Sequence, residues 1–284
     1  MSELSRRGTF RLPAGRRIAY VEWGEPGAEV LMCVHGLTRC ARDFDFLAPE
    51  MARRGYRVIC PDVAGRGDSD WLKEPMDYAI PTYAKDMLML MADQKLESVR
   101  WVGTSLGGLI GMAIAAMPES PIQRLALNDV GPVLTLAAIR RIAEYVGKWP
   151  PLPTIEAAEQ FVRATSATFG PHTDAEWRFL TEHVVRRNAD GSFRMHYDPA
   201  IAVPFNAELP DRDLELWKLY DTIHCPTLVL RGEHSDLLSR ETVGQMAVRG
   251  PRAHAIEIPG VGHAPTLIHA DQIAVVRDFL LAGR

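Results

Sequence analysis

Short apolar runs alternate along the chain with longer segments of helical periodicity. This alternation is typical of strands joined by crossover helices in a mostly parallel sheet. The runs V-L-M-C-V and T-L-V-L are continuously apolar, as expected of strands covered on both faces. The predicted strands are Arg16–Trp23, Val30–Val34, Arg57–Pro61, Val99–Gly103, Leu125–Asn128, Thr227–Arg231 and Ala255–Ile258. The predicted helices are Asp43–Arg53, Thr82–Gln94, Leu106–Ala116, Arg240–Val248 and Asp271–Leu281.

The stretch from 133 to 220 lacks this alternation. Its pattern predicts several helices separated by three helix-breaking segments: P-P-L-P (Pro150–Pro153), G-P-H-T (Gly170–Thr173) and N-A-D-G (Asn188–Gly191). The alternation of apolar strands and helices resumes at Pro226. We therefore predict a core of residues 1–132 and 221–284 with a helical cap, residues 133–220, inserted between two strands. Loops at the carboxyl ends of parallel strands carry binding sites, so the cap is expected to roof a pocket.

Composition narrows the class of protein. The 284 residues are 47% apolar and 24% charged, which suits one large globular domain with an insertion. A net charge of −4 argues against a nucleic-acid binder. No run approaches the ~18 apolar residues of a membrane span, and the N-terminal residues lack the apolar core of a secretory signal. We expect a cytoplasmic protein with no membrane partner; the sequence does not predict its oligomeric state.

Metal ligation is not indicated. The four cysteines contain no C-x-x-C pair, and the nine histidines are dispersed without H-E-x-x-H. We expect no metal and no cofactor.

The strongest chemical signal is W-V-G-T-S-L-G-G-L-I-G, from Trp101 to Gly111. A strand runs into G-x-S-x-G and a small-residue apolar helix follows, which is the context of a nucleophile elbow. The serine of such an elbow occupies a strained turn, so its neighbours two residues away must be small. Ser105 is therefore the predicted nucleophile; the alternative is a glycine-rich turn whose serine only caps the helix.

A base and an acid are predicted after later strands. His263 lies in I-P-G-V-G-H-A-P, a glycine- and proline-bounded loop after the last predicted strand, and is the predicted base. Asp236, in the loop that ends T-L-V-L-R-G-E-H-S-D, is the predicted acid that fixes the imidazole tautomer. Asp129, after the strand that ends in Asn128, is the alternative acid.

These motifs, together with His35-Gly36 after a buried strand, resemble the α/β-hydrolase superfamily in its serine-nucleophile, carboxylesterase-like branch. The order Ser105, Asp236, His263 is that of the superfamily. The resemblance covers about residues 8–130 and 221–284. It implies an eight-stranded, mostly parallel sheet, an acyl-enzyme mechanism without a cofactor, and an oxyanion hole made by the backbone N–H groups of Leu37 and Leu106.

Within this superfamily the expected activity is cleavage of small to medium acyl esters or hydroxy-acid esters. A C–C bond hydrolase, a lactonase or a cofactor-free haloperoxidase-like enzyme fits the same residues, and a ligand-binding protein without activity is a further alternative. Candidate substrate contacts are His35, Trp177 and Trp217. The competing interpretations are that His35 bonds nearby backbone and that the aromatic residues form the insertion's own core.

Overall fold

The computed structural model describes residues 5–207 and 211–282 and centres on one large sheet. The sheet has eight strands in the order β1-β2-β4-β3-β5-β6-β11-β12. Pairs β1–β2 and β2–β4 are antiparallel and the others are parallel, which confirms the predicted fold class. The strands are β1 (Arg6–Arg11), β2 (Arg17–Trp23), β3 (Glu29–Val34), β4 (Tyr56–Pro61), β5 (Val99–Thr104), β6 (Ile122–Asn128), β11 (Thr227–Gly232) and β12 (His254–Ile258).

One edge strand was absent from the strands predicted from the pattern. β1 pairs with β2 in a register that sets Phe10 opposite Ile18, and Phe10 is the buried residue of β1. A strand with a single buried side chain shows no apolar run and no alternation, so periodicity does not reveal it.

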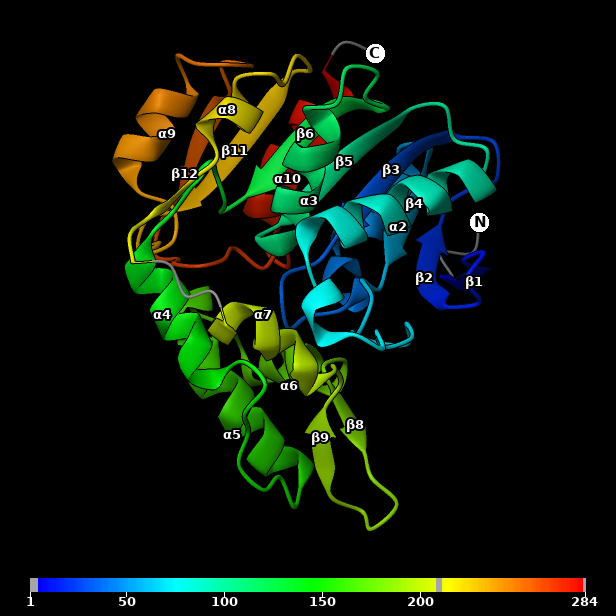
Figure 1. The fold of residues 1–284 in the computed structure, drawn as a ribbon, viewed down its shortest axis with the longest axis vertical. Coiled ribbons are helices and arrows are strands. Elements are labelled where there is room, and N and C mark those ends of the chain that lie inside the picture. Colours follow the sequence, from blue (N-terminus) through cyan, green and yellow to red (C-terminus); the bar gives the residue numbers. More distant parts are fainter. Residues whose placement is uncertain (1–4, 208–210, 283–284) are drawn as a thin grey trace.

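Helices cover both faces of the sheet. Side chains from alternate strand positions, such as Met32 and Trp101, pack with α2 and α3 on one face, whereas Leu31 and Val102 pack with α1 and α10 on the other. Figure 1 shows α2 and α3 in front of the sheet and α10 behind it. This double covering explains the continuously apolar strands. The helices of the core are α1 (Leu47–Arg53), α2 (Ile80–Asp93), α3 (Leu106–Ala115), α8 (Trp217–Tyr220), α9 (Arg240–Met246) and α10 (Ala270–Leu281).

Between β6 and β11 the chain leaves the sheet and forms a separate layer, drawn in green and yellow below the sheet in Figure 1. Its base is closed by a short antiparallel pair, β7 (Val133–Leu134) with β10 (Leu214–Glu215). Its helices are α4 (Leu136–Tyr145), α5 (Ile155–Thr165), α6 (Asp174–Glu182) and α7 (Ala202–Ala207).

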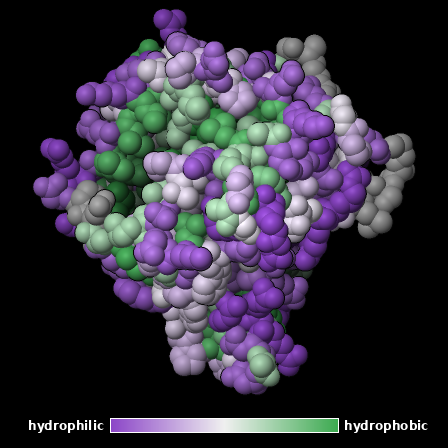
Figure 2. Space-filling view, turned by 45° about the vertical axis from the view of Figure 1, so that its right-hand side comes forward, coloured by the Kyte–Doolittle hydropathy of each residue, from purple (hydrophilic) through white to green (hydrophobic). Residues whose placement is uncertain are grey.

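This inserted layer is not purely helical. Strands β8 (Val185–Arg187) and β9 (Phe193–Met195) form a hairpin, and N-A-D-G at 188–191 is its turn rather than a break between helices. Strands this short carry too few residues for a periodic signal. Figure 2 shows that the lower end of the molecule, where this hairpin projects, is mostly hydrophilic.

Across residues 5–207 and 211–282, no helix is both long and apolar enough to cross a bilayer.

Candidate active site

Ser105 occupies the turn between β5 and α3. Its backbone has φ 51° and ψ −112°, a conformation that side chains other than glycine rarely adopt. A Cβ on Gly107 would lie 1.9 Å from the carbonyl oxygen of Val34, and one on Gly103 would lie 2.3 Å from the Gly107 backbone. Only glycine therefore lets α3 start this close to β3 and β5, and the close approach fixes the Ser105 side chain at the carboxyl edge of the sheet.

His263 and Asp129 complete a hydrogen-bonded series with Ser105. The His263 Nε2 atom lies 3.0 Å from Ser105 Oγ, and its Nδ1 atom lies 2.8 Å from Asp129 Oδ2. Because a carboxylate only accepts, Nδ1 carries the proton and Nε2 accepts from the serine hydroxyl. This arrangement is the one in which an imidazole removes the proton of an attacking serine.

The surroundings of Asp129 hold its carboxylate in one orientation. The residue is fully buried, with φ 54° at the end of β6. Its Oδ1 accepts from the Gly232 backbone N–H at 2.8 Å, and its Oδ2 accepts from the Ser235 hydroxyl at 2.7 Å as well as from His263. Three donors thus fix the carboxylate that orients the imidazole.

The prediction of Asp236 as the acid is wrong. Its side chain is 37% exposed and binds Arg141 of α4 through two bonds of 2.6 and 2.9 Å. Its backbone carbonyl accepts from the Thr135 hydroxyl, also in the inserted layer. The loop after β11 instead directs Ser235 toward the site. Both aspartates follow parallel strands, and the sequence did not show that α4 supplies an arginine to one of them.

Leu37 and Leu106, whose backbone N–H groups are the expected oxyanion donors, line the same groove as Ser105. Leu106 is the first residue of α3, where helical geometry leaves N–H groups unpaired. A Cβ on Gly36, next to Leu37, would lie 3.8 Å from the Ser105 Cβ. Within the described ranges neither amide donates a backbone hydrogen bond.

His35 is not a substrate contact. Its ring is fully buried, with Nδ1 donating to the Gly36 carbonyl at 2.7 Å and Nε2 accepting from the Val63 N–H at 2.9 Å. Burial lowers the pKa of His35 to about 4, so the ring is neutral at pH 7. The histidine therefore joins the turns after β3 and β4, as the backbone-bonding interpretation predicts.

Trp177 and Trp217 also lie outside the cavities at Ser105. Trp177 is buried in a small cluster with Leu180 and Ile268 and stacks on Phe169, with ring centroids 6.5 Å apart. Trp217 packs edge-on against Tyr220 and lies under the guanidinium of Arg249. Both predicted contacts are wrong, since these large rings fill space between elements.

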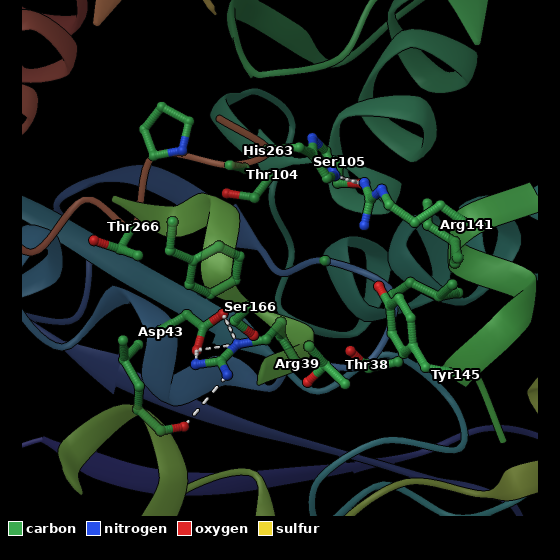
Figure 3. Close-up of a pocket in the computed structure, with 18 of the residues that line it drawn as sticks. Thr38, Arg39, Asp43, Thr104, Ser105, Arg141, Tyr145, Ser166, His263 and Thr266 are labelled. Carbon is green, nitrogen blue, oxygen red and sulfur yellow. Dashed lines mark hydrogen bonds and ion pairs between the residues drawn. The ribbon is translucent and has the colours of Figure 1, made fainter. Parts of the chain in front are cut away.

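Two cavities open on Ser105. A cavity of about 80 Å³ lies between the turns after β3 and β12 and helix α4 (Figure 3). Charged and hydroxyl-bearing side chains line it beside apolar ones, and for those groups it is called the polar cavity. An apolar groove of about 410 Å³ runs between α2, α3 and the inserted layer. Ser105, Leu37 and Ile142 line both, whereas His263 lines only the polar cavity. No motif or periodicity marks Arg39, Arg141 or Tyr145 as lining residues, because they reach this cavity only through the packing of α4 and of the turn after β3.

A mostly parallel sheet that places a serine on the turn between its fifth strand and the following helix defines an α/β-hydrolase architecture. The chain belongs to the α/β-hydrolase fold family, because a sequence model of that family matches residues 29–270. The resemblance seen in the sequence motifs is thereby confirmed.

Similar proteins cover almost the whole chain. A 3-hydroxybutyrate-oligomer hydrolase from Cupriavidus necator is 46% identical over 276 residues, which is 94% of both proteins. The crystal structure of a putative hydrolase from Rickettsia typhi matches with a TM-score of 0.89 and 32% identity, covering 98% of each chain. An α/β hydrolase from Novosphingobium aromaticivorans matches with a TM-score of 0.86 and 34% identity over 99% of each chain.

Proposed function

We propose that this protein hydrolyses esters of short 3-hydroxy acids, oligomers of 3-hydroxybutyrate above all, through an acyl-enzyme on Ser105. The observation that carries the proposal is the hydrogen-bonded series Ser105–His263–Asp129, which opens on the two cavities. The 46% identity to a 3-hydroxybutyrate-oligomer hydrolase over nearly full length supports the substrate class.

In the first step, His263 Nε2 takes the proton of Ser105 as Oγ attacks the ester carbonyl carbon. Asp129 holds the Nδ1 proton and stabilises the imidazolium. The N–H groups of Leu37 and Leu106 are the donors for the tetrahedral oxyanion. Collapse breaks the C–O bond to the alcohol, which leaves with the proton from His263.

In the second step, water gives a proton to His263 and its oxygen attacks the acyl carbon. The Ser105–acyl bond then breaks, the acid leaves, and the proton returns to Ser105.

The inserted layer, which the pair β7–β10 closes, serves in this proposal as a cap that selects the acyl group. The predicted cap of residues 133–220 also included α8, which belongs to the core. This role is supported by the lining of the groove, to which α4 contributes Ile139 and Ile142 and α3 contributes Leu109. A mostly apolar lining favours a short hydrocarbon-rich chain over a highly charged one.

The test is release of 3-hydroxybutyrate from the dimer and trimer by the wild-type protein and by Ser105→Ala. We expect hydrolysis by the wild type and a fall in kcat of at least about 10⁴-fold in the variant. A simple lactone and a C–C hydrolase substrate are assayed alongside the oligomers, to test the two alternative activities. Turnover of either in place of the oligomers, or turnover that survives Ser105→Ala, would overturn the proposal.

A further inference from the structure

The two cavities at Ser105 differ in charge. The polar cavity is lined by Arg39, Asp43 and Arg141, besides hydroxyl-bearing residues and His263. Arg39 binds Asp43 through three contacts of 2.6–3.1 Å, so these two charges balance each other. Arg141 is balanced by Asp236, which is not among the residues lining the cavity. The cavity wall therefore carries a guanidinium whose carboxylate partner lies outside the cavity.

The guanidinium of Arg141 retains donors for a second partner. Its Nε and Nη2 atoms bind Asp236, and this leaves Nη1 unbound by that carboxylate. An arginine has five N–H donors in a planar fork, so it can hold one carboxylate and still bind another. Tyr145, one turn along α4, lines the same cavity and accepts a further hydrogen bond from Arg141. With one donor used by Tyr145 and two by Asp236, the guanidinium still has donors left. In Figure 3 the Arg141 side chain extends from α4 toward Ser105, whereas Arg39 and Asp43 face each other.

The position of His263 indicates which cavity holds the alcohol part of an ester and which holds its acyl part. The leaving alcohol must receive a proton from His263 Nε2, so its oxygen has to lie beside that atom. His263 lines the polar cavity and not the groove. The leaving alcohol therefore occupies the polar cavity and the acyl chain lies in the groove.

The volumes agree with this assignment. The polar cavity of about 80 Å³ compares with ~10–15 Å³ for one water, so it has room for a small group of a few heavy atoms. The groove of about 410 Å³ has room for a longer chain.

We propose that Arg141 binds the terminal carboxylate of a hydroxy-acid oligomer, so that the protein removes single hydroxy acids from the carboxylate end. This inference rests on the proposed function and names the end of the substrate that the site recognises. For an oligomer, the terminal unit leaves as a hydroxy acid with its new hydroxyl at His263 and its carboxylate at Arg141. The remaining acyl chain is transferred to Ser105 and then to water, so that atoms and protons balance in both steps.

The first experiment compares the 3-hydroxybutyrate dimer as the free acid with its methyl ester. A charge-assisted hydrogen bond contributes enough to favour the acid by about 10- to 100-fold in kcat/KM in the wild type. We expect Arg141→Ala to bring this ratio close to one and Arg141→Lys to restore part of it.

The matched control is Asp236→Asn. It removes the same ion pair but leaves the arginine, so the acid-to-ester ratio is expected to stay at or above that of the wild type. A fall in the ratio as large as in Arg141→Ala would mean that the ion pair, and not Arg141 itself, sets the preference, and would overturn the inference.

The second experiment uses a trimer isotopically labelled in its carboxylate-terminal unit. The first monomer released should carry the label; release of unlabelled monomer first would contradict the inference. Equal rates on acid and methyl ester would contradict it too, yet would leave ester hydrolysis by Ser105 intact. Absence of any hydrolysis that depends on Ser105 would instead refute the proposed function.

Discussion

At the scale of single residues, the two aspartates near Ser105 have opposite surroundings. Asp129 is fully buried and accepts three hydrogen bonds, one of them from His263. Asp236 is partly exposed and binds Arg141. A buried carboxylate held by fixed donors can orient an imidazole, whereas a half-exposed ion pair contributes only ~0–1 kcal/mol to stability.

Exchange of each aspartate for asparagine separates these roles. Asp129→Asn should lower kcat by about 10⁴-fold, because an amide that donates to Nδ1 favours the wrong tautomer of His263. Asp236→Asn should keep kcat for a neutral ester near that of the wild type. Steady-state kinetics on folded variants, checked by circular dichroism, measures both. A crippled Asp236→Asn beside an active Asp129→Asn would reverse the assignment.

His35 should make stability depend on pH. Burial lowers its pKa from 6.5 to about 4, so between these values the unfolded chain binds a proton that the folded chain does not. The contribution of His35 to the free energy of unfolding therefore has its full value above pH 6.5. It falls as the pH drops toward 4, by about 3 kcal/mol in total.

The check is the free energy of unfolding against pH for the wild type and His35→Gln. Asp62, whose pKa burial raises to about 6, gives the opposite slope in both proteins and cancels in the difference. The wild-type advantage should shrink between pH 6.5 and 4. A difference that stays constant with pH would show that the ring does not titrate in this way.

At the scale of elements, the strand–turn–helix around Ser105 depends on close backbone contacts. The sequence predicts this strand–turn–helix, because its local geometry requires a buried apolar strand, the G-x-S-x-G spacing and a helix of small residues. The same reasoning predicted His263 as the base, and the structure sets its Nε2 atom 3.0 Å from Ser105 Oγ. That reasoning could not choose between Asp129 and Asp236, since that choice depends on how the loop after β11 packs against α4, a contact between distant parts of the chain.

Glycine-to-alanine exchange tests the close contacts. Gly107→Ala sets a Cβ 1.9 Å from the Val34 carbonyl oxygen, so α3 must move. We expect a loss of about 1–3 kcal/mol or more in stability together with most of the activity. In the exposed helix position Gly244 a Cβ meets nothing within 4 Å, and Gly244→Ala should stabilise by ~0.5–1 kcal/mol. Thermal unfolding and ester hydrolysis measure both; a tolerated Gly107→Ala would contradict the packing argument.

At the scale of the whole molecule, the groove is formed between the sheet core and the inserted layer. The loss of alternating strands after residue 132 predicts an insertion there; in the structure β6 ends at Asn128 and the next strand of the large sheet is β11. It did not predict which side chains face Ser105. The rings of Trp177 and Trp217 pack into clusters between elements, and the groove is lined instead by residues such as Ile139 and Leu237.

Selectivity for acyl length should follow this groove. Ile139→Ala enlarges it and should shift the ratio of kcat/KM for long over short acyl esters upward by roughly 1–3 kcal/mol. Val162→Ala is the control, because Val162 is buried in α5 and lines neither cavity. It should lower stability without moving the acyl-length profile. Identical profiles for the two variants would remove the support for selection by the inserted layer.

The most direct test of the account is covalent labelling by a fluorophosphonate, located by peptide mass spectrometry. The hydrogen bond from Ser105 to His263 and the strained turn of α3 predict one adduct, on Ser105, in the folded wild-type protein. Labelling should be slowed by orders of magnitude in His263→Ala. An adduct on another serine, or none in the folded wild-type protein, would contradict the assignment of Ser105 as the nucleophile.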